Sequence, residues 1–510
     1  MRRLSVAAVF LVSCGPSTLP TTTPTPTPSV SASTVGKPTL PPKVEDFRAK
    51  PPQKEGTVTF VPPNVVEGHV GKKDGGMRVL LVERHELPIV AVQVVSNRGA
   101  AHTAPAQCAF MAAMLTQGTK KHSALAFADE MERLGARWGA SCGYDSVVVS
   151  GQVLSAKLAA FVPLLAEMVR TPAFDSKEID RERKKRLTDL QQQKDSPSSL
   201  AWRTVLSTLY PAGHPYALPT LGDEASVTAV TKKSLEEAYA RTVVANAMTL
   251  VVVGDVTEAA LMPLLEKGFG DMSHKVVAAT PPPPLPNPVS EPRIVVLDRP
   301  GAVQSTVNIV RVGEKRNTPE WARLTLMNYV VGGHFASRIN MNLREKHAYT
   351  YGAGSSFQMW HMAGPFNAGG GIKSEHTAAA IKELLDELAR MRDAKISDEE
   401  LDEAKTGLVD QLPGRFSTMD ETAGSLAALA IYALPLDEYA TRPARYSATT
   451  LDDVQRLAKD YLKADDLRIV IVGDATKIVP SLEALKFGKV EVRKPEPKVE
   501  PKPEPKKGGK

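Results

Sequence analysis

The chain has 510 residues, of which 42% are hydrophobic and 24% charged, and its formal net charge is +6. This length exceeds one ordinary hydrophobic core, so we expect two or more folded domains. The composition excludes a largely disordered or membrane-spanning protein, and the lack of a basic stripe interleaved with aromatic residues argues against nucleic-acid binding.

The N-terminal stretch MRRLSVAAVFLVSCG combines two arginines with a short apolar run and leads to Cys14. The run is too short to cross a bilayer, so residues 1–13 are predicted to be a secretory signal peptide. The sequence Leu-Val-Ser-Cys at its end is similar to a bacterial lipobox, which predicts Cys14 as the lipid-attachment site. The alternative is an ordinary signal peptide with an incidental cysteine. We therefore expect a lipid-anchored protein of the bacterial cell envelope, on the periplasmic face of the outer membrane.

Residues 14–50 are rich in proline, threonine and serine and contain little that a core could bury, which predicts a tether. The two remaining cysteines, Cys108 and Cys142, could pair in an oxidising compartment. Two cysteines do not make a framework for a fold of this size, so two buried free thiols are the favoured interpretation.

The elements that follow alternate between strand and helix patterns. MRVLLVE at 77–83 and IVAVQVVSN at 89–97 predict strands. An apolar helix is expected over 106–117, and an amphipathic helix is expected to begin at the N-cap Ser123 and end at Gly135. The strand pattern DSVVVSGQV and the helix pattern KLAAFVPLLAEMV come next. This order predicts an α+β domain, an open sheet with helices packed on one face.

The second half repeats the first. LVVVGDVTEAALMPLLEK is similar to IVIVGDATKIVPSLEALK, and FDSKEIDRERKKRL is similar to ISDEELDEAKTGL. In the second pair, Asp175 and Ser397 each precede a glutamate by three positions, a helix-start signature. The interval between these two residues nearly equals that between Gly254 and Gly473, so we infer a duplicated domain. Charged residues after Asp175, including Asp180, Arg181 and Glu182, are expected to form a solvated helix face.

Four segments, AMLTQGTKKHSALAFADEMERLGA, YPAGHPYALPTLGD, VVVGDVT and GGHFASRINMNLREKHAYTYG, resemble the insulinase/pitrilysin metallopeptidases. The resemblance is strongest to the two-domain branch that includes mitochondrial processing peptidase. It implies two homologous α+β domains, 51–279 and 293–492, each an open, mostly antiparallel sheet with helices on one face. A Pro-rich linker at 280–292 is predicted to join them, and the Pro/Lys/Glu segment 493–510 is predicted to be a disordered tail.

Active members of that family carry His-x-x-Glu-His on the helix before the Gly-Thr pair, where residues one turn apart can hold one zinc ion. Aligned on Gly118-Thr119, these positions are Ala109, Ala112 and Ala113 in this chain. The family's third ligand, a glutamate, falls near Asp189. One carboxylate does not hold zinc, so we expect no intrinsic catalytic residue, no metal site and no cofactor in this chain.

The resemblance also assigns Arg344 and Tyr351, in LREKHAYTYG, to the contact with substrate across the cleft from the zinc. A guanidinium and a phenol can donate hydrogen bonds to a peptide carbonyl as it gains negative charge. On spacing alone, Arg344 would be a solvated helix residue and Tyr351 a residue of a strand core.

These observations favour a non-catalytic subunit that lines a peptide-binding chamber and supplies Arg344 and Tyr351 to a partner's active site. The expected partner is a homologue that carries the zinc motif, and peptidase activity is expected only with that partner. Two alternatives remain open. One is a stand-alone pseudopeptidase that binds extended peptides along a sheet edge without cleaving them. The other is a metallopeptidase with an unconventional site that uses Asp189.

Overall fold

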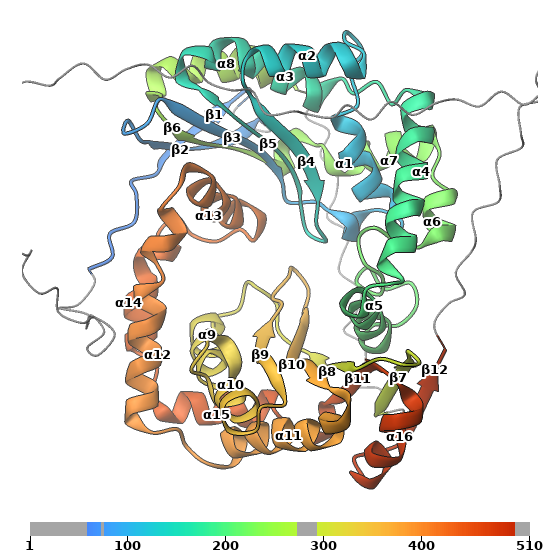
Figure 1. The fold of residues 1–510 in the computed structure, drawn as a ribbon. Coiled ribbons are helices and arrows are strands. Elements are labelled where there is room, and N and C mark those ends of the chain that lie inside the picture. The colour runs from blue at the N-terminus through green and yellow to red at the C-terminus, as the bar shows by residue number, and fades with distance from the viewer. Residues whose placement is uncertain (1–58, 73–75, 273–292, 495–510) are drawn as a thin grey trace, which may run out of the picture. The chain divides into compact units, whose positions relative to one another are not determined.

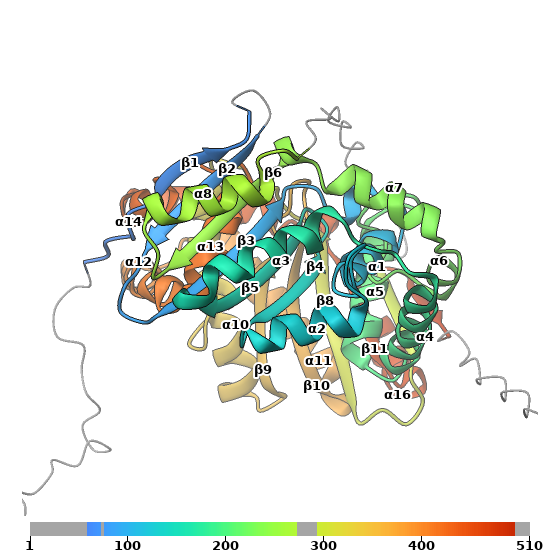
Figure 2. The ribbon, with the colours of Figure 1, turned by 90° about the horizontal axis from the view of Figure 1, so that it is seen from above.

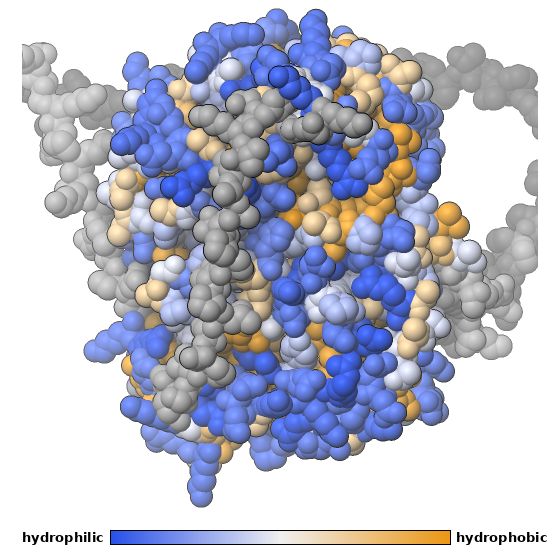
Figure 3. Space-filling model, turned by 180° about the vertical axis from the view of Figure 1, so that it is seen from behind, coloured by the Kyte–Doolittle hydropathy of each residue, from blue (hydrophilic) through white to orange (hydrophobic). Residues whose placement is uncertain are grey.

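The computed structural model describes residues 59–72, 76–272 and 293–494, which all fall in one compact unit (Figure 1). The predicted signal peptide, the tether and the linker lie outside the described residues, as does the tail beyond residue 494. Over most of the face seen in Figure 3 the surface is hydrophilic, and hydrophobic residues gather along one side of it.

The described residues of the N-terminal half include six strands and eight α-helices. Its strands are β1 (Val66–Val70), β2 (Met77–Glu83), β3 (Ile89–Ser96), β4 (Arg137–Cys142), β5 (Val147–Leu154) and β6 (Met248–Gly254). Its helices are α1 (Gln107–Leu115), α2 (Ala124–Arg133), α3 (Leu158–Arg170), α4 (Ser176–Gln193), α5 (Pro197–Leu209), α6 (Glu224–Thr228), α7 (Lys232–Thr242) and α8 (Glu258–Phe269).

The C-terminal half has an equivalent set of elements. Its strands are β7 (Ile294–Asp298), β8 (Gln304–Val312), β9 (Thr350–Phe357), β10 (Pro365–Lys373), β11 (Arg468–Gly473) and β12 (Val490–Arg493). Its α-helices are α9 (Trp321–Asn328), α10 (Arg338–Asn340), α11 (Thr377–Asp393), α12 (Asp398–Asp410), α13 (Met419–Ile431), α14 (Glu438–Ser447), α15 (Leu451–Tyr461) and α16 (Ala475–Ala484). Two π-helical segments, Tyr329–Gly333 and Met341–Lys346, continue α9 and α10.

Each half forms one six-stranded mixed sheet. The strand orders are β1-β2-β6-β3-β5-β4 and β12-β7-β11-β8-β10-β9. The series β2-β6-β3-β5-β4 of the first sheet has the same order as β7-β11-β8-β10-β9 of the second. In both series the first pair is parallel and the other pairs are antiparallel. The structure therefore confirms the predicted α+β fold with two similar halves.

The helices of each half cover one face of its own sheet. In the first half, α3 and α8 lie across the strands and contact each other (Figure 2). The apolar residues of α3 recur every three or four positions, so Phe161, Leu165 and Val169 all point into the core. The predicted helix starts are also present, since Ser123, Asp175 and Ser397 each accept a hydrogen bond from the first turn of the helix that they cap.

The second face of each sheet is covered by a helix from the opposite half, which the sequence analysis did not anticipate. Helix α13, from the C-terminal half, packs through Ala423, Leu426 and Leu429 on strands of the first sheet. Helix α5, from the N-terminal half, packs on β8 and β11 of the second sheet through residues that include Val205 and Leu206. Because both faces are covered, the central strands β6 and β11 are buried at every residue and lack the alternation of a half-exposed strand.

A polar contact also joins the halves. The Asp145 carboxylate, 4% exposed, accepts hydrogen bonds from the Tyr216 hydroxyl (2.7 Å) and from the backbone N–H of His361 (2.8 Å). Burial, together with the negative charge of Asp145, raises the pKa of Tyr432 to about 12. A buried carboxylate needs such donors, so Asp145 fixes the β4–β5 turn against the β9–β10 loop.

Cys108 and Cys142 form a disulfide, with their Cα atoms 5.9 Å apart. The expectation of two free thiols was therefore wrong. Cys108 lies in the first turn of α1 and Cys142 ends β4, and these two elements pack together in the fold. The spacing of the two cysteines in the sequence carries no information about that contact.

Two charged networks stabilise the C-terminal half. In the first, Glu438, 2% exposed, accepts hydrogen bonds from Arg316, Arg442 and Arg445 at 2.8, 3.2 and 2.7 Å. The guanidinium groups of Arg316 and Arg442 each lie 4.3 Å from the ring centroid of Trp321. This cluster attaches α14 to the start of α9.

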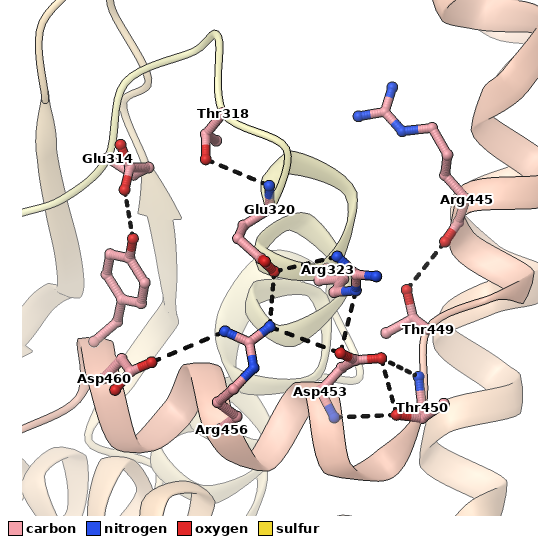
Figure 4. A network of polar contacts seen from close by, with 11 residues as sticks. Glu314, Thr318, Glu320, Arg323, Arg445, Thr449, Thr450, Asp453, Arg456 and Asp460 are labelled. Carbon is pink, nitrogen blue, oxygen red and sulfur yellow. Dashed lines mark hydrogen bonds and ion pairs between the residues drawn. The ribbon is translucent and has the colours of Figure 1, made fainter.

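The second network joins α15 to α9 and is more exposed (Figure 4). The Arg456 guanidinium lies 2.9 Å from the Glu320 carboxylate, and Arg323 lies 3.3 Å from Asp453. Partly exposed ion pairs of this kind contribute little to stability individually. The first network, built around the buried carboxylate of Glu438, therefore matters more for the stability of the fold.

We predict that Glu438→Gln lowers the free energy of unfolding by about 3–5 kcal/mol, because it leaves buried guanidinium groups without a counter-charge. Burial alone would raise the pKa of Glu438, but the hydrogen bond and charge of Arg316 and the charges of Arg442 and Arg445 hold it below its ordinary value. The stabilisation is therefore present above the unfolded-state pKa and is lost as the pH falls through the lower folded-state pKa. Urea denaturation at neutral and acidic pH measures both effects.

The matched control is Glu375→Gln, because the Glu375 side chain is 75% exposed and its ion pair, with His376, lies at the surface. Its effect should stay below about 1 kcal/mol. Equal losses in the two variants would contradict the role assigned to Glu438.

Candidate functional site

Helix α1 carries the three positions that the sequence analysis aligned with the metal motif. Ala112 is buried, and Ala109 and Ala113 are half-buried on one face, one turn apart. The opposite side of α1 is anchored by Phe110, Met111 and Met114, which are fully buried. The helix is thus required by the core, and alanine at the remaining positions preserves its helical propensity.

The turn after α1 requires a glycine. Gly118 has a φ of +89°, and a Cβ atom there would lie 2.7 Å from the backbone nitrogen of Ala124. The following residue, Thr119, is buried and its hydroxyl contacts Glu167. The Gly-Thr pair used for the alignment is therefore a structural turn that positions α1.

A buried arginine from α4 lies against the alanine face. The Arg186 guanidinium donates a hydrogen bond to the Ala109 carbonyl oxygen (2.7 Å) and lies 5.2 Å from the centroid of the Phe110 ring. It pairs with Glu182 at 2.9 Å, and both side chains are about one-tenth exposed. Burial lowers the pKa of Arg186, while the charges of Glu182 and then Asp189 oppose that shift. Arg186 thus places a positive charge beside α1.

Zinc does not fit this arrangement. None of the three alanines has a lone pair on its side chain, and no group of three or more potential His, Cys, Asp or Glu ligands occurs within residues 59–72, 76–272 and 293–494. Asp189 is half-buried on α4, and its charge acts on Arg186. A cation next to a buried guanidinium would also be repelled.

Glu182 corrects one expectation. The charged run after Asp175 was assigned to a solvated face, but Glu182 is buried and holds Arg186. The sequence did contain a signal, because Ile179, Glu182 and Arg186 recur at the three- and four-residue spacing of a buried helix stripe.

Arg344 and Tyr351 are both accessible. Arg344 lies in the π-helical segment Met341–Lys346 and its side chain is 40% exposed. Its guanidinium stands 4.7 Å from the ring centroid of Phe335, and its Nε lies 3.2 Å from Glu345. Tyr351, near the start of β9, is 85% exposed, so the alternative that placed it in a strand core was wrong.

The element that carries Arg344 and Tyr351 is held together by Asn340, which is buried. Its side-chain amide donates to the Phe335 carbonyl oxygen (2.7 Å), and its Oδ1 accepts from the backbone N–H of Ala353 (3.1 Å). Asn340 therefore links the loop before α10 to strand β9. Short π-helical segments are often found at functional sites, and here one of them carries Arg344.

The two sheets share one order of five strands, which ends at the edge strand β4 in the first sheet and at the edge strand β9 in the second. The sheets differ at these two edges. On β9, side-chain amides occupy the outer edge, since Asn340 accepts from the Ala353 N–H and Asn328 donates to the Ser355 carbonyl oxygen (3.0 Å). On β4, no described residue bonds the outer backbone groups, and a Cβ atom on Gly139 would meet nothing within 4 Å. Among the described residues, β4 is therefore the one of these two edges that is open to another strand.

Comparisons with known proteins agree with this fold. Residues 78–224 match the model of the insulinase family of peptidases, family M16, and residues 229–408 match the model of the peptidase M16 inactive domain. An uncharacterized zinc protease of Rickettsia felis is 22% identical over 67% of this chain and 82% of its own length. A non-peptidase homologue, YmxG, of Helicobacter pylori is 21% identical over 78% of this chain and 92% of its own length.

Two solved structures show the same architecture. A peptidase M16 inactive domain from Pseudomonas fluorescens has a TM-score of 0.72 and 26% identity, covering 80% of this chain and 98% of that one. A protease from Helicobacter pylori has a TM-score of 0.73 and 20% identity, covering 81% of this chain and all of that one. The matches to both family models, together with this shared architecture, show that the chain is an insulinase-family (M16) peptidase homologue.

Proposed function

We propose that this protein is the non-catalytic subunit of a heterodimeric zinc peptidase, with a zinc-motif homologue as its partner. The observation that carries the proposal is the contrast between the two halves. In the first half, the positions aligned with the metal motif are alanines, and the buried guanidinium of Arg186 lies against them. In the second half Arg344 and Tyr351 remain exposed on a well-fixed element.

In such a pair, Arg344 and Tyr351 would act on the peptide carbonyl as it gains negative charge. Both side chains offer hydrogen-bond donors, and the ring of Phe335 supports the Arg344 guanidinium from one side. Preorganised donors of this kind stabilise charge that develops during the reaction and change ground-state binding less. The chain itself would hold no metal and no other cofactor.

A second candidate, a stand-alone binder of extended peptides, is favoured by the open edge of β4. A peptide could add there as a further strand and use main-chain hydrogen bonds for affinity. The corresponding edge of β9 does not offer this, because Asn328 and Asn340 already bond its backbone groups. We do not propose a metallopeptidase that uses Asp189, because metal-assisted hydrolysis requires several converging ligands.

We also propose that Cys14 anchors the protein to the outer membrane and that the folded halves face the periplasm. The support is the lipobox-like sequence together with the proline-rich tether that follows it. Among the described residues, no helix is both long enough and apolar enough to cross a membrane.

The first prediction from this proposed function concerns zinc binding. The purified protein should contain well under one zinc ion per chain after dialysis against a weak chelator, as measured by inductively coupled plasma mass spectrometry. The variant Ala109→His/Ala112→Glu/Ala113→His should bind zinc at least about tenfold more tightly when Arg186→Met is added, because the buried cation is then removed. Stoichiometric zinc in the wild type would contradict the prediction, as would equal zinc affinity with and without Arg186→Met.

The second prediction concerns the pair. Co-purified with a zinc-motif homologue, Arg344→Ala and Tyr351→Phe should each lower kcat by about a hundredfold and change KM much less. The matched control is Arg133→Ala, because Arg133 is an exposed residue of α2 and its ion pair with Glu130 lies within the same helix. The proposal fails if the complex forms and the two variants cleave at the wild-type rate, or if the homologue alone is as active as the pair. Absence of a stable partner would favour the stand-alone binder.

The third prediction concerns the anchor. Cys14→Ser should leave the protein unprocessed or release it from the membrane fraction, because the lipid-attachment site is lost. Cell fractionation and metabolic labelling with a fatty acid measure this. A Cys14→Ser variant that is processed and still sediments with membranes like the wild type would disprove lipid anchoring.

A further inference from the structure

A cavity of about 380 Å³ lies beside the N-terminus of α1, between the loop that follows β3 and the segment that follows α5. Its walls include Tyr144, Tyr210, Ala217 and Pro219, and none of the residues that line it is charged. The volume is within the range of small-molecule sites, towards its lower end. An uncharged, mostly apolar ligand of amino-acid size would match both the volume and the lining.

One polar atom in this lining, Nε2 of His214, has no hydrogen-bond partner among the described residues. His214 is 7% exposed, and its Nδ1 accepts a hydrogen bond from the backbone N–H of Tyr216 (3.0 Å). Because Nδ1 accepts this bond, the proton of the neutral ring is on Nε2, and burial lowers the pKa of His214, which favours the neutral ring. The Nε2 atom is buried and makes no hydrogen bond with any described residue. Buried N–H groups are nearly always bonded to protein or to water, so this donor is available to an acceptor on a ligand that enters the cavity.

The rest of the cavity is rigid. The hydroxyls of Tyr144 and Tyr210 donate to the backbone carbonyls of Leu218 and Ala363, both at 2.8 Å, and the ring of Tyr210 stacks on that of His214. Ala106, also in the lining, has a φ of +65°, which is rare for a residue with a Cβ atom. Backbone held in this region is concentrated at binding and catalytic sites. The cavity is therefore shaped before a ligand arrives.

We propose that this cavity binds an apolar group of amino-acid size together with an adjacent amide carbonyl, which accepts a hydrogen bond from His214 Nε2–H. The shared chemistry fits either a free small amide or one large apolar residue of a peptide. The cavity lies within this chain, so binding depends neither on a partner subunit nor on a metal ion.

The test uses the purified full chain with ¹⁵N-labelled histidine and N-acetylphenylalaninamide as the probe. The Nε2–H signal of His214 should shift saturably with probe concentration, while the signal of His85, which pairs with Asp255 at the surface, stays unchanged. Absence of a saturable shift at millimolar probe would overturn the proposal.

Three variants locate the site. His214→Asn keeps an acceptor for the Tyr216 N–H, but the shorter asparagine amide places no donor at the position of Nε2, so binding should weaken about three- to tenfold. Ser207→Phe, at an exposed position of α5 that lines the cavity, should abolish binding by filling it. Ser198→Phe, at an exposed position of the same helix outside the cavity lining, is the matched control and should bind like the wild type. Equal affinity of Ser207→Phe and Ser198→Phe, or wild-type affinity of a folded His214→Asn, would refute the assignment.

A second arm identifies the source of the ligand. A capped heptapeptide with one phenylalanine among serine and glycine residues is titrated against the bound probe. Displacement at a lower concentration than the free amide requires would identify a peptide residue as the ligand, because flanking backbone then adds affinity. Displacement only at the concentration that the free amide needs would identify a small amide. No displacement, with the probe bound, would exclude a peptide residue and leave the small amide as the ligand.

Discussion

The exchange of α5 and α13 between the halves is the interaction on which the rest of the structure depends. Each sheet has two apolar faces, and the helices of its own half cover only one of them. The other face would expose Val251 and Val253 of the first sheet, or Val470 and Val472 of the second, if the exchanged helix were absent. Burying a side chain of this size contributes about 1.5–3 kcal/mol to stability. Separating the halves would expose several such side chains and lose this contribution for each of them. The halves are therefore interdependent parts of one folded body.

Alanine at the three positions of α1 that align with the metal motif is compatible with the fold, because other parts of this helix hold it in place. Helix α1 is held by its apolar side and by the turn at Gly118, and neither depends on the residues at 109, 112 and 113. Once alanine occupies those positions, the Arg186–Glu182 pair provides both the charge and the hydrogen bond at the carbonyl of Ala109. Restoring ligands to α1 alone would place them beside a buried guanidinium.

Much of the fold was accessible from the sequence because it depends on local signals. The strands at 77–83 and 89–96, the helix caps at Ser123 and Ser397, and the repeated segments near Gly254 and Gly473 were all predicted correctly. The features that were missed depend on contacts between distant segments. The Cys108–Cys142 bond needs α1 against β4, and the burial of Glu182 needs α4 against α1. The exposure of Tyr351 and the blocking of β9 by Asn328 and Asn340 likewise arise only when the loops of the second half are in place.

The disulfide, the open edge and the cavity form a continuous arrangement in the first half. Cys142 ends β4 and is bonded to Cys108 of α1, so the open edge is covalently fixed to the helix that carries Ala109, Ala112 and Ala113. Two residues further on, Tyr144 forms one wall of the cavity, and Asp145 is fixed to the second half through the His361 N–H. The open edge of β4 and the lining residue Tyr144 thus belong to one β4–β5 hairpin, next to an apolar cavity that offers the donor His214 Nε2. Main-chain pairing accepts any sequence, whereas a cavity of fixed size and polarity discriminates among side chains. Selectivity for particular peptides would thus reside in this chain even if all the chemistry belongs to a partner.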